Sequence, residues 1–252
     1  MKVDRRYILS VLAGAAVSAG EPVLAAEARI GRLIDEAKGL PSIAARIGFI
    51  SRALVGSKYR DYTLIGSPKK PEQFVVRDDV FDCVTYCETV LAAAMAHDLA
   101  GFEAALRTVR YHNGVVAYNE RNHYFHDWIQ RNIANKTCRA VAIDGAVTIQ
   151  KTLTWHREFG RRPVSMHVIP TAVFLANGKR VANGDIVGFV THQPNLDYFH
   201  VGFAVHGGKG ELMLRHASQM HQRVLDERMQ AFIDAYRVRY VTLLRPEEPA
   251  AS

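Results

Sequence analysis

Cys83 and His200 are side chains whose types and positions could support nucleophilic catalysis. Cys83 follows Asp82, which favours a helix N-cap, and the residues after it predict an almost wholly buried helix from 83 to about 97. Backbone N–H groups in the first turn of a helix stabilise a thiolate and can hold the oxyanion of a tetrahedral intermediate. Because the Asp82 charge opposes this effect, the thiol needs a cationic partner.

A histidine can supply that partner, since it takes the thiol proton and later returns one to a leaving amine. Of the eleven histidines, His200 stands near the start of a predicted strand over residues 199–206. Gly202 shares its face and leaves room for a neighbour. On the next predicted strand, His216 alternates with leucines and could orient the His200 ring as the third member of a triad.

The other two cysteines favour structural roles. Cys87 lies one helical turn after Cys83, where a disulfide between them would have poor geometry, and it fits the core. Cys138 is interpreted as structural, and a Cys87–Cys138 bridge stays open.

A metal site is not expected. His123, His126 and Asp127 have a spacing that could place them on one helix face. Without a further ligand, an exposed helix face or a pocket wall is the favoured interpretation.

Helices are predicted in the first half of the chain and strands in the second. Predicted helices include residues 30–37, one opened by Pro41-Ser42, and one capped by Asp98. Predicted strands cover residues 168–175, 185–190, 199–206, 211–218 and 239–244, with a helix at about 224–236. This order favours an α+β fold with a small antiparallel sheet, in a single domain over residues 27–252.

Residues 1–26 have the order of a signal peptide: Lys2, Arg5 and Arg6, then an apolar run, then small residues. The sequence therefore predicts export to the periplasm or cell envelope and no membrane-spanning segment in the mature chain. The net charge is +7, but the basic residues are scattered without interleaved aromatics, so nucleic acid is not expected as a partner.

A family resemblance appears in residues 81–90, Phe-Asp-Cys-Val-Thr-Tyr-Cys-Glu-Thr-Val. This segment resembles the nucleophile helix of NlpC-type papain-like hydrolases and, more narrowly, of their N-acetylmuramoyl-L-alanine amidase-like family. Further segments are similar in order, and the resemblance extends from about residue 50 to 245: they are residues 56–59, 121–128, 184–187 with 199–202, and 215–218. The 56–59 loop departs from the family's Gly-Thr-Pro-Tyr at its two middle positions.

The resemblance implies a papain-like NlpC-type fold with Cys83, His200 and His216 as the triad. It also implies that Tyr59 lines the site beside Asp82 and helps the oxyanion. The segment around 121–128 would shape the substrate pocket, with residues suited to sugar rings or a carboxylate: Arg121, His123, Tyr124 and Trp128.

The implied activity is hydrolysis of the MurNAc–L-alanine amide bond of peptidoglycan or muropeptides, with no metal or organic cofactor. Three alternatives remain open at this point. The scissile bond could lie within the stem peptide, the chain could be a non-catalytic wall-binding module, or the acyl-enzyme could pass to an amine acceptor.

Overall fold

The computed structural model describes residues 21–249, with side chains from residue 27 onward. The predicted signal segment, residues 1–26, therefore lies almost wholly outside the described residues. No helix in the described range has the length and apolar character needed to cross a membrane.

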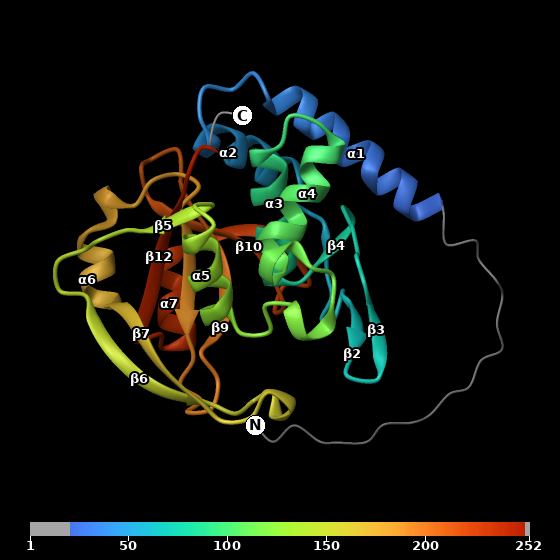
Figure 1. Ribbon diagram of the computed structural model, residues 1–252. Coiled ribbons are helices and arrows are strands. Elements are labelled where there is room, and N and C mark those ends of the chain that lie inside the picture. The colour runs from blue at the N-terminus through green and yellow to red at the C-terminus, as the bar shows by residue number, and fades with distance from the viewer. Residues whose placement is uncertain (1–20, 250–252) are drawn as a thin grey trace.

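The first half of the chain forms the predicted helices, together with a further helix over residues 125–134 (Figure 1). Their bounds are α1 (Glu21–Ala37), α2 (Ile43–Ala53), α3 (Cys83–Met95), α4 (Leu99–Arg110) and α5 (Phe125–Ala134). The side chains of Ser42, Asp82 and Asp98 cap α2, α3 and α4 by accepting backbone N–H groups, which confirms the predicted helix starts. Single 3₁₀ turns occur at His112–Gly114, Tyr118–Glu120, Arg157–Phe159 and Gly178–Arg180.

Ten strands form one curled sheet in the order β4-β1-β11-β10-β9-β8-β12-β7-β6, with β5 paired to β12. Neighbours are antiparallel except β1 and β4, which are parallel. The bounds are β1 (Lys58–Tyr59), β4 (Val80–Phe81), β5 (Cys138–Ala140), β6 (Val147–Leu153), β7 (Arg162–Pro170), β8 (Ile186–Val190), β9 (Tyr198–His206), β10 (Leu212–Ser218), β11 (Arg223–Arg228) and β12 (Tyr240–Pro246). A separate hairpin joins β2 (Ile65–Ser67) and β3 (Lys70–Gln73).

The sheet lies between two groups of helices (Figure 1). One hydrophobic cluster joins α1 to α5 to one face. A second cluster lies on the other face, under α6 (Thr171–Ala176) and α7 (Met229–Tyr236). The mixed α+β prediction is therefore confirmed, although the sheet is larger than expected.

Two predicted elements are wrong in part. The strand expected over residues 168–175 ends at Pro170, and residues 171–176 form helix α6 instead. The helix expected from about residue 224 begins only at Met229, because residues 223–228 form β11. Pairing along β10 prevails there over the helix propensity of Leu225 and Glu227.

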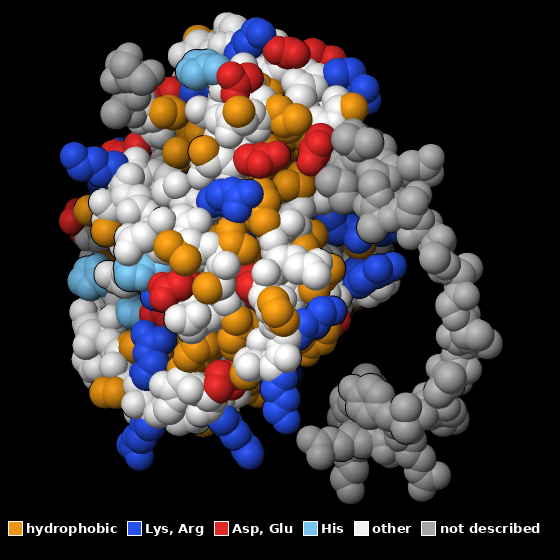
Figure 2. All heavy atoms as spheres, turned by 45° about the vertical axis from the view of Figure 1, so that its right-hand side comes forward, with side chains coloured by type: hydrophobic (Ala, Val, Ile, Leu, Met, Phe, Trp, Pro, Cys, Tyr) orange, Lys and Arg blue, Asp and Glu red, His pale blue; other side chains and the backbone are white. Residues whose placement is uncertain are grey.

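Lys and Arg side chains are spread around the edge of the face seen in Figure 2 and interspersed with acidic ones. Hydrophobic side chains occupy much of its middle. This arrangement matches the scattered charge of the sequence.

Candidate active site

Cys83 is the first residue of α3, held there by a capping box. The Asp82 carboxylate accepts the backbone N–H groups of Val84 at 3.0 Å and Thr85 at 2.8 Å. The Thr85 hydroxyl in turn accepts the Asp82 N–H at 3.0 Å. Two otherwise unpaired helix donors are thus satisfied, which fixes the start of the helix at the thiol.

The Cys83 thiol is half-buried and mostly protonated at neutral pH. Burial raises its pKa to about 12, and the adjacent Asp82 carboxylate acts in the same direction. Backbone N–H groups of Val201, Cys83 and Val84 act against them. The thiol therefore lies beside the β9 backbone, at the residue directly after His200.

Aromatic packing fixes α3 against β9. Tyr86, one turn into α3, places its ring 5.9 Å from Phe203 and 5.7 Å from Phe81, both edge-on. Its hydroxyl donates to the Ser51 carbonyl of α2 at 2.9 Å. These buried contacts set the position of the Cys83 turn relative to the strand that carries His200.

His200 and His216 are in direct contact across β9 and β10. Nε2 of His200 lies 2.6 Å from Nδ1 of His216, with the rings nearly perpendicular. Gly202 makes this approach feasible, because a Cβ there would lie 2.8 Å from the His216 Cβ and 2.9 Å from the Arg215 carbonyl oxygen. The open face predicted from Gly202 is therefore filled by His216.

An apolar wall surrounds the histidine pair. The Phe232 ring of α7 lies 5.1 Å from the His200 ring and 5.4 Å from the His216 ring, and Phe189 lies 6.1 Å from His200. Burial, followed by the neighbouring His216, holds the pKa of His200 well below its usual value. His200 is therefore neutral at pH 7 and able to accept a proton.

The structure places Tyr59 beside Cys83, as expected for the 56–59 loop. Strand β1 pairs with β4, so that Tyr59 is opposite Phe81, two residues before Cys83. Burial, then the hydrogen bond that Tyr59 donates to Asp61, then the nearby Cys83 all raise the pKa of this phenol. Tyr59 therefore keeps its proton in the physiological range.

Comparison of the sequence with models of known families shows the family of the chain. The model of the N-acetylmuramoyl-L-alanine amidase-like family, AmiA-like, matches residues 49–238. The chain belongs to this family. No curated protein is similar enough to count as a match.

Solved structures share the fold of this amidase-like chain. A Legionella pneumophila protein of the DUF1460 family superposes with a TM-score of 0.81 at 23% identity, over 92% of this chain and 98% of its own. A Bacteroides uniformis N-acetylmuramoyl-L-alanine amidase superposes with a TM-score of 0.72 at 23% identity, over 80% of this chain and 99% of its own. At such identities the likeness concerns the fold.

Two residues predicted to bind substrate have internal partners in this amidase-like chain. The Arg121 guanidinium donates to the Glu72 carboxylate at 3.0 Å and lies 5.0 Å above the Tyr118 ring. His123 donates to the Tyr118 carbonyl at 2.6 Å, and burial lowers its pKa to about 4. Arg121 therefore has a carboxylate partner already, and His123 is neutral at pH 7.

The other two predicted pocket residues, Tyr124 and Trp128, are buried in this structure. Trp128 is fully buried and stacks 5.0 Å from Phe125. Tyr124 is 1% exposed, and its hydroxyl accepts the backbone N–H of His156 at 2.9 Å.

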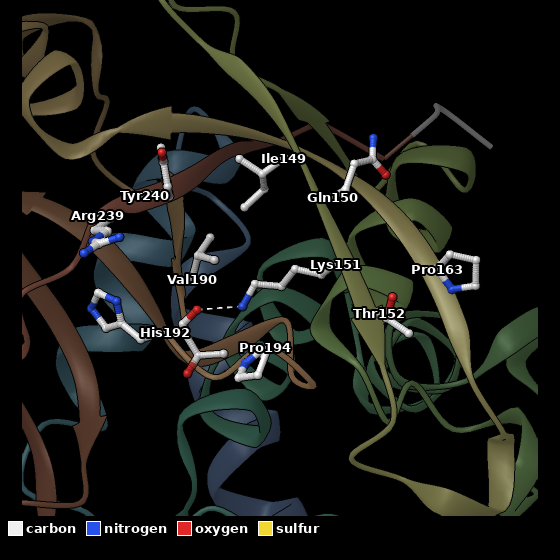
Figure 3. Close-up of a pocket in the computed structure, with 11 residues that line it drawn as sticks. Ile149, Gln150, Lys151, Thr152, Pro163, Val190, His192, Pro194, Arg239 and Tyr240 are labelled. Atoms are coloured by element: carbon white, nitrogen blue, oxygen red, sulfur yellow. Dashed lines mark hydrogen bonds between the residues drawn. The ribbon is translucent and has the colours of Figure 1, made fainter.

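A cavity of about 500 Å³ lies away from these residues, between β6, β7, β12 and the loop after β8 (Figure 3). Lys151 reaches across it and donates to the carbonyls of Thr191 at 2.6 Å, Gln193 at 2.8 Å and Leu196 at 2.8 Å. With all three ammonium protons engaged, Lys151 fastens the β6–β7 hairpin to the loop that leads into β9.

The described residues contain no cluster of His, Cys, Asp or Glu suited to a metal ion. Cys83, Cys87 and Cys138 are all free thiols, so the bridge left open between Cys87 and Cys138 is not formed. Sequence reasoning missed Glu227, whose Oε1 atom lies 2.6 Å from His216 Nε2. Glu227 was missed because residues from about 224 to 236 were predicted to form a helix, which gives no reason to place Glu227 next to His216.

Proposed function

We propose that the chain is a cysteine amidase that hydrolyses the MurNAc–L-alanine bond of peptidoglycan fragments. The observation that carries this proposal is the contact of 2.6 Å between His200 on β9 and His216 on β10, next to the point where the Cys83 thiol lies beside the Val201 backbone. Membership of the amidase-like family supports an amide as the scissile bond. An NlpC-type papain-like arrangement of the site is part of the same proposal.

The proposed reaction starts from a neutral pair, a Cys83 thiol and a His200 imidazole. Because Nε2 of His200 faces His216, its Nδ1 atom is the one free to take the thiol proton. The sulfur then attacks the lactyl carbonyl carbon, and the carbonyl electrons move to oxygen. Collapse of this intermediate breaks the C–N bond, and His200 gives its proton to the departing alanine nitrogen.

The second half releases the sugar. A water molecule gives a proton to His200 as its oxygen attacks the thioester carbonyl. Collapse frees the muramic acid carboxyl, and the sulfur recovers its proton from His200. No metal or organic cofactor enters this sequence of steps.

Stabilisation of the oxyanion falls to donors already near the sulfur. The backbone N–H group of Cys83 lies in the first turn of α3, where the helix dipole adds to its effect, whereas the Val84 N–H already donates to the Asp82 carboxylate. Tyr59 remains protonated and adjacent, so its hydroxyl could exchange its bond to Asp61 for one to the oxyanion.

Export remains part of the proposal. Peptidoglycan fragments occur in the cell envelope, and residues 1–26 have the charge and apolar order of a signal peptide. We expect the mature chain to act in the periplasm or envelope after removal of this segment.

The test is mass spectrometry of purified muropeptides after incubation with the parent protein and with Cys83→Ala and His200→Ala. We expect only the parent to release a peptide that starts with L-alanine together with the intact sugar. The Cys83→Ala variant should lose at least about 10³-fold in rate, because removal of a nucleophile leaves only binding and the oxyanion donors.

Other outcomes separate the alternatives. Products cut inside the stem peptide would replace the amidase with an endopeptidase of the same mechanism. An adduct with an added amine would indicate a transferase. Wall binding by both the parent and Cys83→Ala, without any product, would support the binding module and contradict the amidase.

A further inference from the structure

Glu227 lies on the same face of the sheet as the histidine pair. In the pairing of β10 with β11, His216 is opposite Leu225 and Leu214 is opposite Glu227. Side chains two residues apart on a strand share a face, so Glu227 is the diagonal neighbour of His216. The separation between diagonal neighbours on adjacent strands is within reach of a glutamate side chain.

The Glu227 carboxylate meets the nitrogen of His216 that does not face His200. Its Oε1 atom lies 2.6 Å from His216 Nε2. That nitrogen is buried, and the described residues offer it no hydrogen bond of good direction. Glu227 itself is 24% exposed, so the carboxylate joins a buried ring to the solvent.

These contacts select one tautomer for each ring. The Glu227 carboxylate has no proton to donate and places its negative charge 2.6 Å from His216 Nε2, which favours the proton on that nitrogen and makes Nδ1 an acceptor. His200 must then donate from Nε2, which leaves its own Nδ1 unprotonated. In the proposed reaction, where His200 takes the thiol proton at Nδ1, that tautomer is the one required.

We propose that Glu227 is a positioning residue that sets the tautomers of His216 and His200 and stabilises the positive charge that forms on His200. This inference rests on the proposed function, in which His200 is the base. Glu227 acts only through His216 and contacts no reacting atom. The contacts join three side chains, His200, His216 and Glu227, and the Cys83 thiol lies beside the Val201 backbone at the residue after His200.

Other charged or titratable groups near these side chains come from three elements. Asp82 and Cys83 lie at the start of α3, and Tyr59 lies on β1. Tyr236 of α7 lies near Glu227. Burial raises the pKa of the Tyr236 phenol, and the Glu227 carboxylate raises it further. Each is unchanged in the variants below, so a difference between variants reports on Glu227.

The first measurement is the tautomer state of the resting protein, which needs no substrate. Two-dimensional ¹H–¹⁵N NMR of ¹⁵N-histidine-labelled protein distinguishes Nδ1–H from Nε2–H rings. We expect Nε2–H for His200 and His216 in the parent and in Glu227→Gln, whose amide oxygen can still accept. Glu227→Leu should show a mixture that includes Nδ1–H.

The second measurement is the pH dependence of Cys83 alkylation by iodoacetamide and of muropeptide cleavage. Glu227→Gln removes the negative charge beside His216, so the protonated form of His200 becomes less favourable. The acidic limb of both pH profiles should therefore move to lower pH. Glu227→Leu should also lower kcat by roughly 10-fold to 100-fold with little change in KM.

Asp226→Asn is the matched control on the same strand. Asp226 pairs with Arg215 at 2.6 Å, so this variant loses stability in urea but keeps the parent tautomers and pH profile. Unchanged tautomers in Glu227→Leu, or an unchanged acidic limb in Glu227→Gln, would overturn the proposal. If the parent cleaves no muropeptide, the NMR and alkylation results still decide the role of Glu227 separately. Should Glu227→Leu fail to fold, the Glu227→Gln profile decides it.

Discussion

The reactivity of Cys83 is set by opposing contributions within one helical turn. Burial and the Asp82 charge raise the thiol pKa, and first-turn N–H groups lower it. Asp82→Asn keeps a cap oxygen for Val84 and Thr85 but removes the charge. We expect roughly tenfold faster alkylation of Cys83 at pH 7, measured with iodoacetamide and peptide mass spectrometry.

The control is Asp98→Asn, which changes the N-cap of α4, where the carboxylate accepts Gly101 N–H. It alters a helix cap of the same type without a nearby thiol. Equal alkylation rates for the parent and Asp82→Asn would show that the Asp82 charge has no effect on the thiol.

At the residue scale, the sequence predicted well where a residue's role follows from local position. Asp82 and Cys83 depend on the first turn of one helix, and that turn is as expected. Tyr124 and Trp128 depend instead on what packs over them, and aromatic side chains suit a pocket and a core equally. Residue type alone could not separate these two environments.

At the element scale, the close approach of β9 and β10 depends on Gly202. A Cβ at this position would be 2.7 Å from Leu214 Cδ1 and 2.9 Å from the Arg215 carbonyl oxygen, which cannot rotate away. We expect Gly202→Ala to cost about 1–3 kcal/mol in the free energy of unfolding and to separate His200 from His216. Urea denaturation and the activity of the folded protein measure the two effects.

Gly208→Ala is the comparison variant, because its added Cβ would meet no atom within 4 Å. It should keep both parent stability and parent activity. A Gly202→Ala protein with the parent stability and kcat would show that the strands can accommodate the methyl group and that Gly202 is not required.

Elements whose pattern is local were predictable, and those that depend on pairing were not. The N-cap residues and the apolar spacing of α2, α3 and α4 predicted where these helices begin. Strand β11 contains charged residues on both faces, and only its pairing with β10 shows it to be a strand. Missing β11 also concealed Glu227, so one error of element type hid the residue that contacts His216.

At the scale of the whole molecule, half-buried neutral histidines make stability depend on pH. Burial lowers the pKa of His123 to about 4, below the unfolded value of about 6.5. Between these values the unfolded chain binds more protons, so the free energy of unfolding is fully present above about pH 6.5 and falls as pH decreases. His200 contributes in the same direction.

We therefore expect His123→Gln to show a smaller loss of stability between pH 7 and pH 5 than the parent, by up to about 2 kcal/mol. Urea denaturation at the two pH values measures the difference. His221→Gln changes an exposed histidine and should keep the parent dependence. An equal pH dependence for His123→Gln and the parent would contradict a lowered pKa of His123.

The order of the sheet has a consequence for how the chain folds. Strand β12 lies between β8 and β7 and also pairs with β5, yet it follows all three in sequence. Until residues 240–246 insert, β7 and β8 each present an unpaired edge, and such edges pair readily with other chains. Aggregation during synthesis or refolding should therefore depend on how quickly this last strand docks, and a chain cut before residue 240 should associate through the two open edges.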